Sequence, residues 1–214
     1  MTTNPTRILL VDDHAVVREG YRRLLESEPH YRVVAEAASG PLAYRRYLEH
    51  RPDVIITDLS LPGVGGIELM RRLRRHGEMR ALAFSVHEET VYVERAFAAG
   101  ALGYLTKRSA ADLLMNAVAA VARGERYLSP DLRLPSQEAG AHESLSAMLE
   151  SLSHREFEIF RQLAEGRPVR QIASGLSISG KTVSNYSSQI RLKLGVQSTA
   201  DMARLAISMG IVRA

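Results

Sequence analysis

Hydrophobic residues in the first half of the chain form five short runs separated by longer amphipathic stretches. The runs are Ile8 to Val11, Val33 to Ala35, Val54 to Thr57, Leu82 to Phe84 and Leu102 to Leu105. Three of them are almost continuous in Val, Ile and Leu, which is typical of strands covered on both faces. The stretches between and after them have helical length, at residues 15–27, 41–50, 65–75, 90–99 and 110–123. This alternation predicts a doubly wound α/β domain with a five-stranded parallel sheet over residues 1–123.

The alternation stops after residue 123. Residues 124–150 contain two prolines and several serines and have no sustained periodicity. They are therefore predicted to form a linker, with a short helix from Glu143 onward.

Residues 151–214 have helical spacing only. Helices are expected at residues 153–165, 168–175, 179–194 and 199–208. Ser153 and Glu156 have the spacing of a capping box at the start of the first, and Gly195 is placed to end the third. This segment is predicted to be an all-α, four-helix domain.

Composition narrows the class of protein. The chain has 214 residues, of which 45% are hydrophobic and 24% charged, as is usual for a globular protein. It has no cysteine, which excludes disulfides, thiolate zinc sites and cysteine nucleophiles. The first residues lack the apolar core of a signal peptide, and no apolar run has the length of a membrane span. We expect a cytoplasmic protein with no membrane partner.

The net charge of +4 is unevenly distributed along the chain. Residues 151–214 contain nine Lys and Arg against four Asp and Glu, whereas the rest is close to neutral. A basic C-terminal domain is expected if that part binds nucleic acid. However, 25 of the 28 basic residues are arginine, so a compositional bias would also explain the excess, and charge alone leaves both explanations open.

Polar residues stand where four of the predicted strands end. Asp12 and Asp13 follow the first strand, Asp58 the third, Ser85 the fourth and Lys107 the fifth. In an open parallel sheet, sites form at the carboxyl ends of the strands, near the point where the strand order reverses. Carboxylates that meet there repel one another, and a hard divalent cation relieves the repulsion. Mg²⁺ fits, because it takes a few carboxylates and keeps water and phosphate oxygens as its other ligands.

These residue types suit the transfer of a phosphoryl group to a carboxylate. With a cation bound, Asp58 can act as a nucleophile and form an acyl phosphate. Lys107 can pair with one phosphoryl oxygen, and the Ser85 hydroxyl can donate to another once the phosphate is in place. That last contact would exist in only one of two states, as a switch requires. Taken singly, each residue also has an ordinary explanation as a cap, a polar loop or a solvated lysine. Their joint placement favours a site.

The first domain resembles the receiver domain of two-component response regulators. The resemblance spans residues 6–123 and is carried by L-L-V-D-D-H, D-V-I-I-T-D-L-S-L-P-G and A-G-A-L-G-Y-L-T-K. It implies a flavodoxin-like fold with Asp58 as phospho-acceptor and Asp13 as a direct Mg²⁺ ligand. Asp12 would help, partly through water, and the backbone carbonyl of Ser60 would be a further ligand. The implied switch residues are Ser85, Lys107 and Tyr104. Tyr104 stands where the family keeps an aromatic side chain that turns inward on activation; the alternative is a half-exposed tyrosine that does not move.

Two histidines border the expected pocket. His14 follows the aspartate pair, and His87 follows the fourth strand. Because Mg²⁺ prefers oxygen ligands, neither is expected to bind it.

The third helix of the C-terminal domain has two different faces. Val183, Tyr186, Ile190 and Leu194 share one face and should pack on the other helices. The other face carries small hydrogen-bonding and basic side chains, with no acidic residue between 179 and 194. It suits the DNA major groove, where Asn reads adenine and Lys reads guanine or phosphate. The residues expected to contact DNA are Lys181, Thr182, Ser184, Asn185, Ser188, Arg191 and Lys193. The alternative is the ordinary polar face of a bundle, which would normally include Glu or Asp.

The C-terminal domain resembles the LuxR-type helix-turn-helix domain of the NarL/FixJ class. The resemblance covers residues 151–212 and is carried by L-S-H-R-E-F-E-I-F, Q-I-A-S-G-L-S-I-S-G-K-T-V-S-N-Y and K-L-G-V. It implies recognition through the K-T-V helix and dimer contacts through the fourth helix. Together, the two resemblances imply a phosphorylation-controlled, DNA-binding transcription regulator with Mg²⁺ as cofactor. The implied partners are double-stranded DNA, a sensor histidine kinase, RNA polymerase and, after phosphorylation, a second copy of the chain.

Two other classes of function share parts of this pattern. An aspartate-nucleophile phosphohydrolase would use a similar core, but it needs a second acid two residues after the nucleophile, where this chain has Ser60. A protein-docking module would place the C-terminal helices against a protein. Salt-dependent binding to random duplex DNA separates that module from a DNA-binding domain. The sequence therefore favours a regulator over an enzyme.

Overall fold

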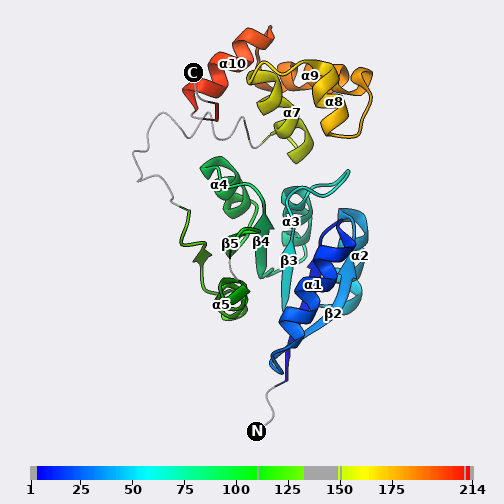
Figure 1. Cartoon of the computed structure of the whole chain (residues 1–214), viewed down its shortest axis with the longest axis vertical. Coiled ribbons are helices and arrows are strands. Elements are labelled where there is room, and N and C mark those ends of the chain that lie inside the picture. Colours follow the sequence, from blue (N-terminus) through cyan, green and yellow to red (C-terminus); the bar gives the residue numbers. More distant parts are fainter. Residues whose placement is uncertain (1–3, 110, 133–148, 150, 210, 213–214) are drawn as a thin grey trace. The chain divides into compact units, whose positions relative to one another are not determined.

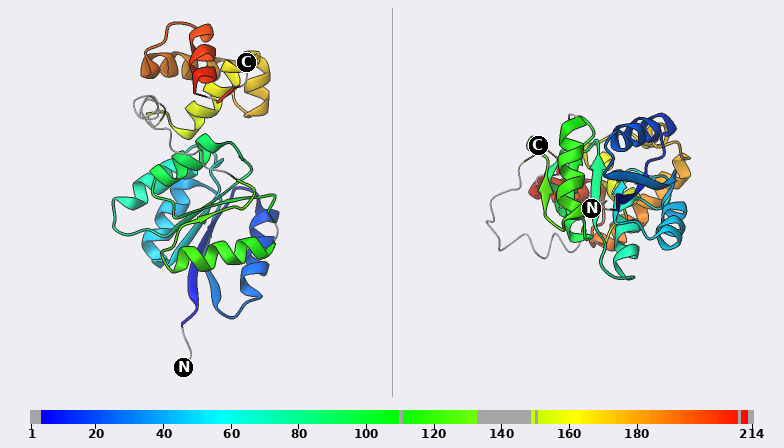
Figure 2. Two further views of the ribbon diagram at one scale, coloured as in Figure 1. Left: turned by 90° about the vertical axis from the view of Figure 1, so that its left-hand side faces the viewer. Right: turned by 90° about the horizontal axis from the view of Figure 1, so that it is seen from below.

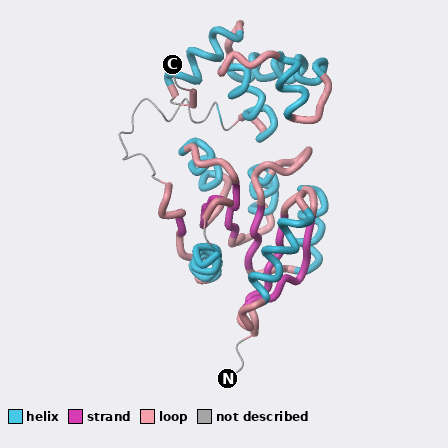
Figure 3. Tube along the Cα trace, in the orientation of Figure 1, coloured by secondary structure: helices cyan, strands magenta, loops and turns pink. Residues whose placement is uncertain are grey.

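The structure, a computed structural model, describes residues 4–109, 111–132, 149, 151–209 and 211–212. The chain divides into two compact units, Met1–Pro135 and Ser136–Ala214. Figures 1 and 3 show strands and helices in the first unit and helices in the second. In the part of the chain that the structure describes, none of the helices combines the length and the apolar composition of a membrane-spanning helix. Of the segment in which a helix was predicted from Glu143 onward, only Leu149 is described, and it is helical; the rest lies outside the described residues.

The described strands of the first unit form one parallel sheet in the order β2-β1-β3-β4-β5-β6. They are β1 Thr6–Val11, β2 Tyr31–Ala37, β3 Val54–Thr57, β4 Ala81–Ser85, β5 Gly103–Thr106 and β6 Tyr127–Leu128. Strand β1 pairs with β2 on one side and with β3 on the other. The strand order therefore reverses between β1 and β3, where ligand sites form in open α/β sheets.

Helices cover both faces of this sheet, as Figure 2 shows. They are α1 Ala15–Glu26, α2 Gly40–His50, α3 Gly66–Arg74, α4 Thr90–Ala98 and α5 Ala111–Ala122. Leu25 of α1 and Val118 of α5 pack against alternate strand residues such as Ile8 and Ile56. The intervening strand residues, such as Ile55, are equally buried. Burial of both faces explains the continuous apolar runs, and the predicted doubly wound α/β fold is confirmed.

The predicted strand number was wrong by one, because β6 lies in the segment predicted as the start of the linker. Tyr127 pairs with Gly103, and Leu128 pairs with Tyr104, in parallel register. The Ser129 amide then donates to the Tyr104 carbonyl at 2.9 Å. A two-residue strand gives no periodic pattern, so pairing with β5 rather than local preference creates it.

Four helices form the described part of the second unit, as predicted. They are α7 His154–Ala164, α8 Val169–Gly175, α9 Gly180–Leu194 and α10 Thr199–Ser208. The predicted capping box is present: the Ser153 hydroxyl accepts from the Glu156 amide, and the Glu156 carboxylate accepts from the Ser153 amide. Gly195 ends α9 with a φ of 64°, a conformation that favours glycine. Their buried apolar residues include Phe157, Phe160, Ile172, Val183, Ile190 and Met202.

The turn between α8 and α9 is held by the backbone and by α7. Ser177 has a φ of 52°, and the Ile178 amide donates to the Ala173 carbonyl at 3.0 Å. Arg155 of α7 donates from Nη2 to the Leu176 carbonyl at 2.6 Å. These contacts make the helix-turn-helix a fixed part of the bundle.

Candidate functional site

Three carboxylates meet where the strand order reverses. Val11 and Thr57, the last residues of β1 and β3, are partners in the sheet register, so the residues that follow them emerge together. Asp12 and Asp58 are 2% and 4% exposed, whereas Asp13 is exposed. One oxygen of each carboxylate lies within 4.8 Å of the others. The structure thus brings these three predicted residues into one acidic pocket.

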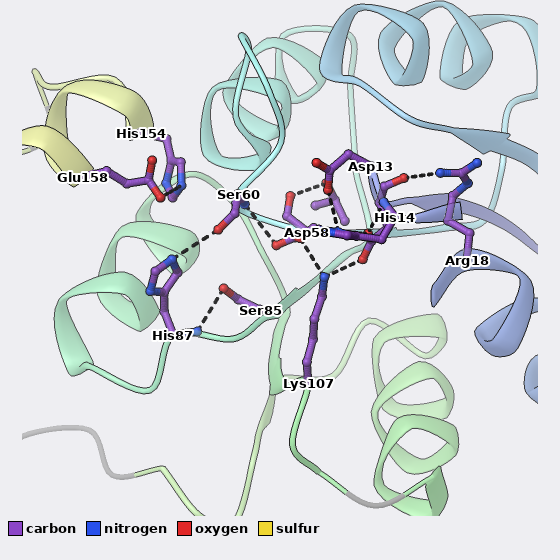
Figure 4. A network of polar contacts seen from close by, with 12 residues as sticks. Asp13, His14, Arg18, Asp58, Ser60, Ser85, His87, Lys107, His154 and Glu158 are labelled. Carbon is purple, nitrogen blue, oxygen red and sulfur yellow. Dashed lines mark hydrogen bonds and ion pairs between the residues drawn. The ribbon is translucent and has the colours of Figure 1, made fainter. Parts of the chain in front are cut away.

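Lys107 enters the pocket from the end of β5, as Figure 4 shows. Its Nζ donates to Asp12 Oδ2 at 2.5 Å and to Asp58 Oδ2 at 2.7 Å. Burial by itself would lower the pKa of Lys107, but the two carboxylates outweigh it and hold the pKa above its ordinary value of 10.5. The lysine therefore remains protonated and offsets part of the negative charge.

Close packing at the start of α3 fixes the backbone of Asp58. A Cβ atom at Gly66 would lie 2.1 Å from the Asp58 carbonyl oxygen, so only glycine fits there. The side chain is fixed as well, because Asp58 Oδ1 accepts the Ser60 amide at 3.0 Å while Oδ2 accepts from Lys107. Sequence reasoning missed Gly66, since a glycine at a helix start does not indicate what packs against it.

His14 lies against the carboxylate oxygens that Lys107 does not contact. Its Nδ1 is 3.1 Å from Asp12 Oδ1 and 2.9 Å from Asp13 Oδ1, and its amide donates to Asp12 Oδ1 at 2.8 Å. Arg18 donates from Nη1 to the Asp12 carbonyl at 2.6 Å and so anchors this loop to α1. The position of His14 beside the pocket was predicted from the sequence, whereas nothing in the sequence indicated that Arg18 contacts this loop.

Ser85 and Tyr104 form a connected group beside the acidic pocket. Both are fully buried. The Ser85 hydroxyl accepts from the His87 amide at 3.3 Å, and the Tyr104 hydroxyl donates to the His87 carbonyl at 2.8 Å. Burial raises the pKa of Tyr104 far above its ordinary value, against a smaller opposite effect of Ser85. Tyr104 is therefore a neutral donor that points inward here, and the half-exposed alternative does not hold.

The His87 side chain joins two loops of the site. Its ring stacks on Tyr92 with the centroids 3.9 Å apart. Its Nε2 is 3.2 Å from the Ser60 hydroxyl, in the loop that follows Asp58. The loop after β4 is thereby connected to the loop after β3, which the sequence gave no means to foresee.

The predicted DNA-contacting residues lie along α9. Lys181, Ser184, Asn185 and Ser188 are exposed, and Thr182 is half-buried. Ser184 and Ser188 donate their hydroxyls to carbonyls of their own helix, at 3.1 and 3.2 Å. The Ser184 oxygen remains able to accept, whereas the Ser188 oxygen accepts from Arg191 Nη2 at 3.4 Å. Val183, Ile190 and Leu194 face the core as predicted, and Tyr186 is half-buried.

Two predicted phosphate contacts, Lys193 and Arg191, already have partners inside the second unit. Lys193 donates to Glu156 Oε2 at 2.7 Å and to the Ser151 carbonyl at 3.2 Å. Arg191 donates to the Gln197 carbonyl at 3.3 Å. Both side chains help to hold the bundle, and their DNA contacts stay predictions.

Known families match both units. The family "Response regulator receiver domain" matches residues 8–119, and "Bacterial regulatory proteins, luxR family" matches residues 150–206. The chain belongs to the two-component response regulators that carry a LuxR-type helix-turn-helix DNA-binding domain. This is a family of transcription regulators and not of enzymes, which removes the phosphohydrolase alternative.

Individual relatives match over most of their length. The transcriptional activator protein ExaE of Pseudomonas putida is 41% identical over 96% of this chain and 98% of its own. A LuxR-family response regulator from Aurantimonas sp. SI85-9A1 is similar in structure, with a TM-score of 0.59 and 50% identity over 60% of this chain and 93% of that one. A structure of two RcsB dimers bound to two parallel DNAs matches with a TM-score of 0.57 and 26% identity, over 96% of this chain and 99% of that one.

Proposed function

We propose that phosphorylation of Asp58 by a sensor histidine kinase controls DNA binding by α9. The observation that carries the proposal is the convergence of Asp12, Asp13, Asp58 and Lys107 at the reversal point of the sheet, in a chain that also has a LuxR-type domain. An oxygen of Asp58 attacks the phosphorus of a kinase phosphohistidine. The new P–O bond forms as the P–N bond breaks, and the electron pair of that bond stays on the histidine nitrogen, so that a ring protonated on its other nitrogen leaves as neutral imidazole.

The donor atoms of the pocket fit Mg²⁺. The ion takes carboxylate oxygens and keeps water and phosphoryl oxygens, and three carboxylates within 4.8 Å offer such a set. Asp12, Asp13 and Asp58 would hold it, together with the Ser60 carbonyl. When bound, Mg²⁺ would neutralise charge on the phosphoryl oxygens. Lys107, released from Asp58 Oδ2, would pair with one phosphoryl oxygen.

Ser85 and Tyr104 are proposed to transmit the change. The Ser85 hydroxyl, which now accepts from the His87 amide, would turn to donate to the phosphoryl group. That exchange alters the loop that also holds the Tyr104 hydroxyl through the His87 carbonyl. A coupling of ~1–3 kcal/mol is typical of allosteric proteins and is enough to shift the output domain.

On the DNA side, the residues of α9 proposed to enter the major groove are Lys181, Ser184, Asn185 and Ser188. A phosphorylated dimer would place two such helices on a two-fold-related site, as in other helix-turn-helix regulators. RNA polymerase is the proposed partner at the promoter, which puts the site of action in the cytoplasm.

The test captures fragmented genomic DNA on the purified protein with Mg²⁺, with and without beryllofluoride, which stands in for the phosphoryl group on Asp58. We expect a two-fold-related motif to be enriched only with beryllofluoride, and not in Asp58→Asn. Equal enrichment in all samples would keep DNA binding and refute phosphorylation control. No enrichment anywhere would favour the protein-docking alternative. A salt titration on random duplex checks that binding weakens as salt rises.

A further inference from the structure

The acidic pocket contains a nitrogen donor that the proposed magnesium site does not use. Of the residues that could hold a metal ion there, three are carboxylates and the fourth is His14. Its ring lies on the outer side of the pocket, and the side chain is 67% exposed. Lys107 forms ion pairs with the Oδ2 atoms of Asp12 and Asp58 on the other side. The Oδ1 atoms of Asp12 and Asp13 face the imidazole, as Figure 4 shows for Asp13 and His14.

The separations match those of ligands on one metal ion. Two donors bound to an octahedral ion at about 2.1 Å, at right angles to each other, are about 3.0 Å apart. His14 Nδ1 is 3.1 Å from Asp12 Oδ1 and 2.9 Å from Asp13 Oδ1. The first of these contacts is a hydrogen bond in this structure, since 2.9–3.1 Å is also the usual hydrogen-bond separation. The imidazole nitrogen thus already lies as close to both carboxylates as an adjacent ligand would, and a metal ion would take the place of the hydrogen that it shares with them.

An imidazole changes which ions a carboxylate site prefers. Mg²⁺ gains little from nitrogen, whereas Co²⁺, Ni²⁺ and Zn²⁺ bind imidazole well and have higher intrinsic affinity for mixed nitrogen and oxygen sites. We propose that His14 is a ligand for late first-row divalent ions, so that such an ion competes with Mg²⁺ for Asp12 and Asp13. The proposal rests on the proposed magnesium site and adds a selectivity that an all-oxygen pocket would lack.

The test compares Co²⁺ and Mg²⁺ binding to the full chain without a histidine tag, at a pH above the ordinary histidine pKa. Calorimetry gives the affinity for each ion, and the visible absorption of Co²⁺ reports a nitrogen ligand. We expect His14→Ala to weaken Co²⁺ binding about tenfold or more and Mg²⁺ binding less than about twofold. His30→Ala is the matched control, because His30 is exposed and its carbonyl accepts from Thr6 at the opposite end of β1. It should change neither affinity.

Two further measurements make the result decisive. His14→Gln checks that the loss does not come from misfolding, since the amide fills similar space and is a poor ligand; thermal unfolding of both variants should match the wild type. In addition, the Nδ1 resonance of His14 should shift far more on adding Zn²⁺, which would bind the nitrogen directly, than on adding Mg²⁺, which would bind only the neighbouring carboxylates.

The outcomes separate this inference from the proposed function. If the wild type binds both ions and His14→Ala binds Co²⁺ equally well, His14 is not a ligand, and the magnesium site stands. If His14→Ala binds Mg²⁺ more tightly with Co²⁺ unchanged, the imidazole competes with cations, and the inference is refuted. If the wild type binds neither ion, the proposed magnesium site fails and the inference fails with it.

Discussion

The acidic pocket and the exposed face of α9 are built in opposite ways. In the pocket, Asp12 and Asp58 are almost fully buried, and both oxygens of Asp58 already have donors. On α9, Lys181 and Asn185 are exposed, and the serine hydroxyls are bonded to their own helix. The pocket is a site whose geometry is set before its ligand arrives, whereas the helix offers side chains that take their final positions on a ligand.

This difference has a consequence for mutations. Residues that shape the pocket also support the sheet, so changes there should affect stability and function together. Residues on the open face of α9 touch little of the bundle, so changes there should affect binding alone.

Gly66→Ala should have the largest effect. The new Cβ would lie 2.1 Å from the Asp58 carbonyl oxygen, so the start of α3 or the Asp58 loop must move. We expect a loss of at least about 2 kcal/mol in the free energy of unfolding of the first unit, together with weaker beryllofluoride binding. Gly20→Ala is the control, because Gly20 lies inside α1 and a Cβ there would meet nothing beyond its own helix backbone within 4 Å. It should stabilise by up to about 1 kcal/mol. Equal effects of the two variants would show that the close packing does not matter.

Asn185→Ala should weaken specific DNA binding and leave stability unchanged. A good bidentate contact of Asn with adenine discriminates by ~1–3 kcal/mol, so affinity for the enriched motif should fall about tenfold. Lys181→Ala should instead weaken binding to specific and random duplexes alike, and the slope of the logarithm of the affinity against the logarithm of the salt concentration should fall by about one. Fluorescence anisotropy on specific and random duplexes, with thermal unfolding beside it, measures both. A drop in melting temperature for Asn185→Ala would contradict the contrast.

Glu156→Gln should destabilise the second unit in a pH-dependent way. Burial alone would raise the pKa of Glu156, but Lys193 and the Ser153 amide outweigh it and hold the pKa below 4.5. A carboxyl with a lowered pKa stabilises the fold above its unfolded pKa, and this contribution is lost as pH falls through the folded pKa. We expect the variant to lose about 1 kcal/mol at neutral pH and nothing once pH is well below 4.

Urea unfolding of Glu156→Gln and of the wild type across this pH range measures the difference in their free energies of unfolding. Glu49→Gln, a change at an exposed carboxylate, should stay within about 0.5 kcal/mol at every pH. A constant difference between Glu156→Gln and the wild type would rule out the charge as its cause.

Ser177→Gly should have the smallest effect and the opposite sign. Ser177 has a φ of 52° in the helix-turn-helix turn, which costs a residue with a Cβ more than glycine. We expect a gain of about 0.5 kcal/mol, whereas Ser174→Gly, inside α8, should lose a similar amount. Chemical denaturation of the two variants side by side checks the signs. A loss for both would mean that the turn is unstrained.

The sequence predicted features that are local or repeated, and missed those that depend on one contact through space. The runs at β1 and β3 were recognisable because burial on both faces leaves them apolar, and Asp12 and Asp58 follow from the ends of those runs. Gly66 and Arg18 were missed because their partners lie on other elements. Lys193 was predicted to contact phosphate because its position along the helix indicates an exposed side chain. The same position gives no sign of the bond that this side chain makes to Glu156 of another helix.

Strand β6 decides where the first unit can be cut from the chain. It covers the outer edge of β5, whose backbone groups would otherwise be open to pairing. A fragment that stops at residue 123 would leave that edge bare, beside Tyr104, and would tend to add strands from other molecules. A fragment that continues to residue 132 carries its own edge protection. Both fragments keep every residue of the acidic pocket, but we expect the one that ends at residue 132 to be monomeric and the one that ends at residue 123 to aggregate.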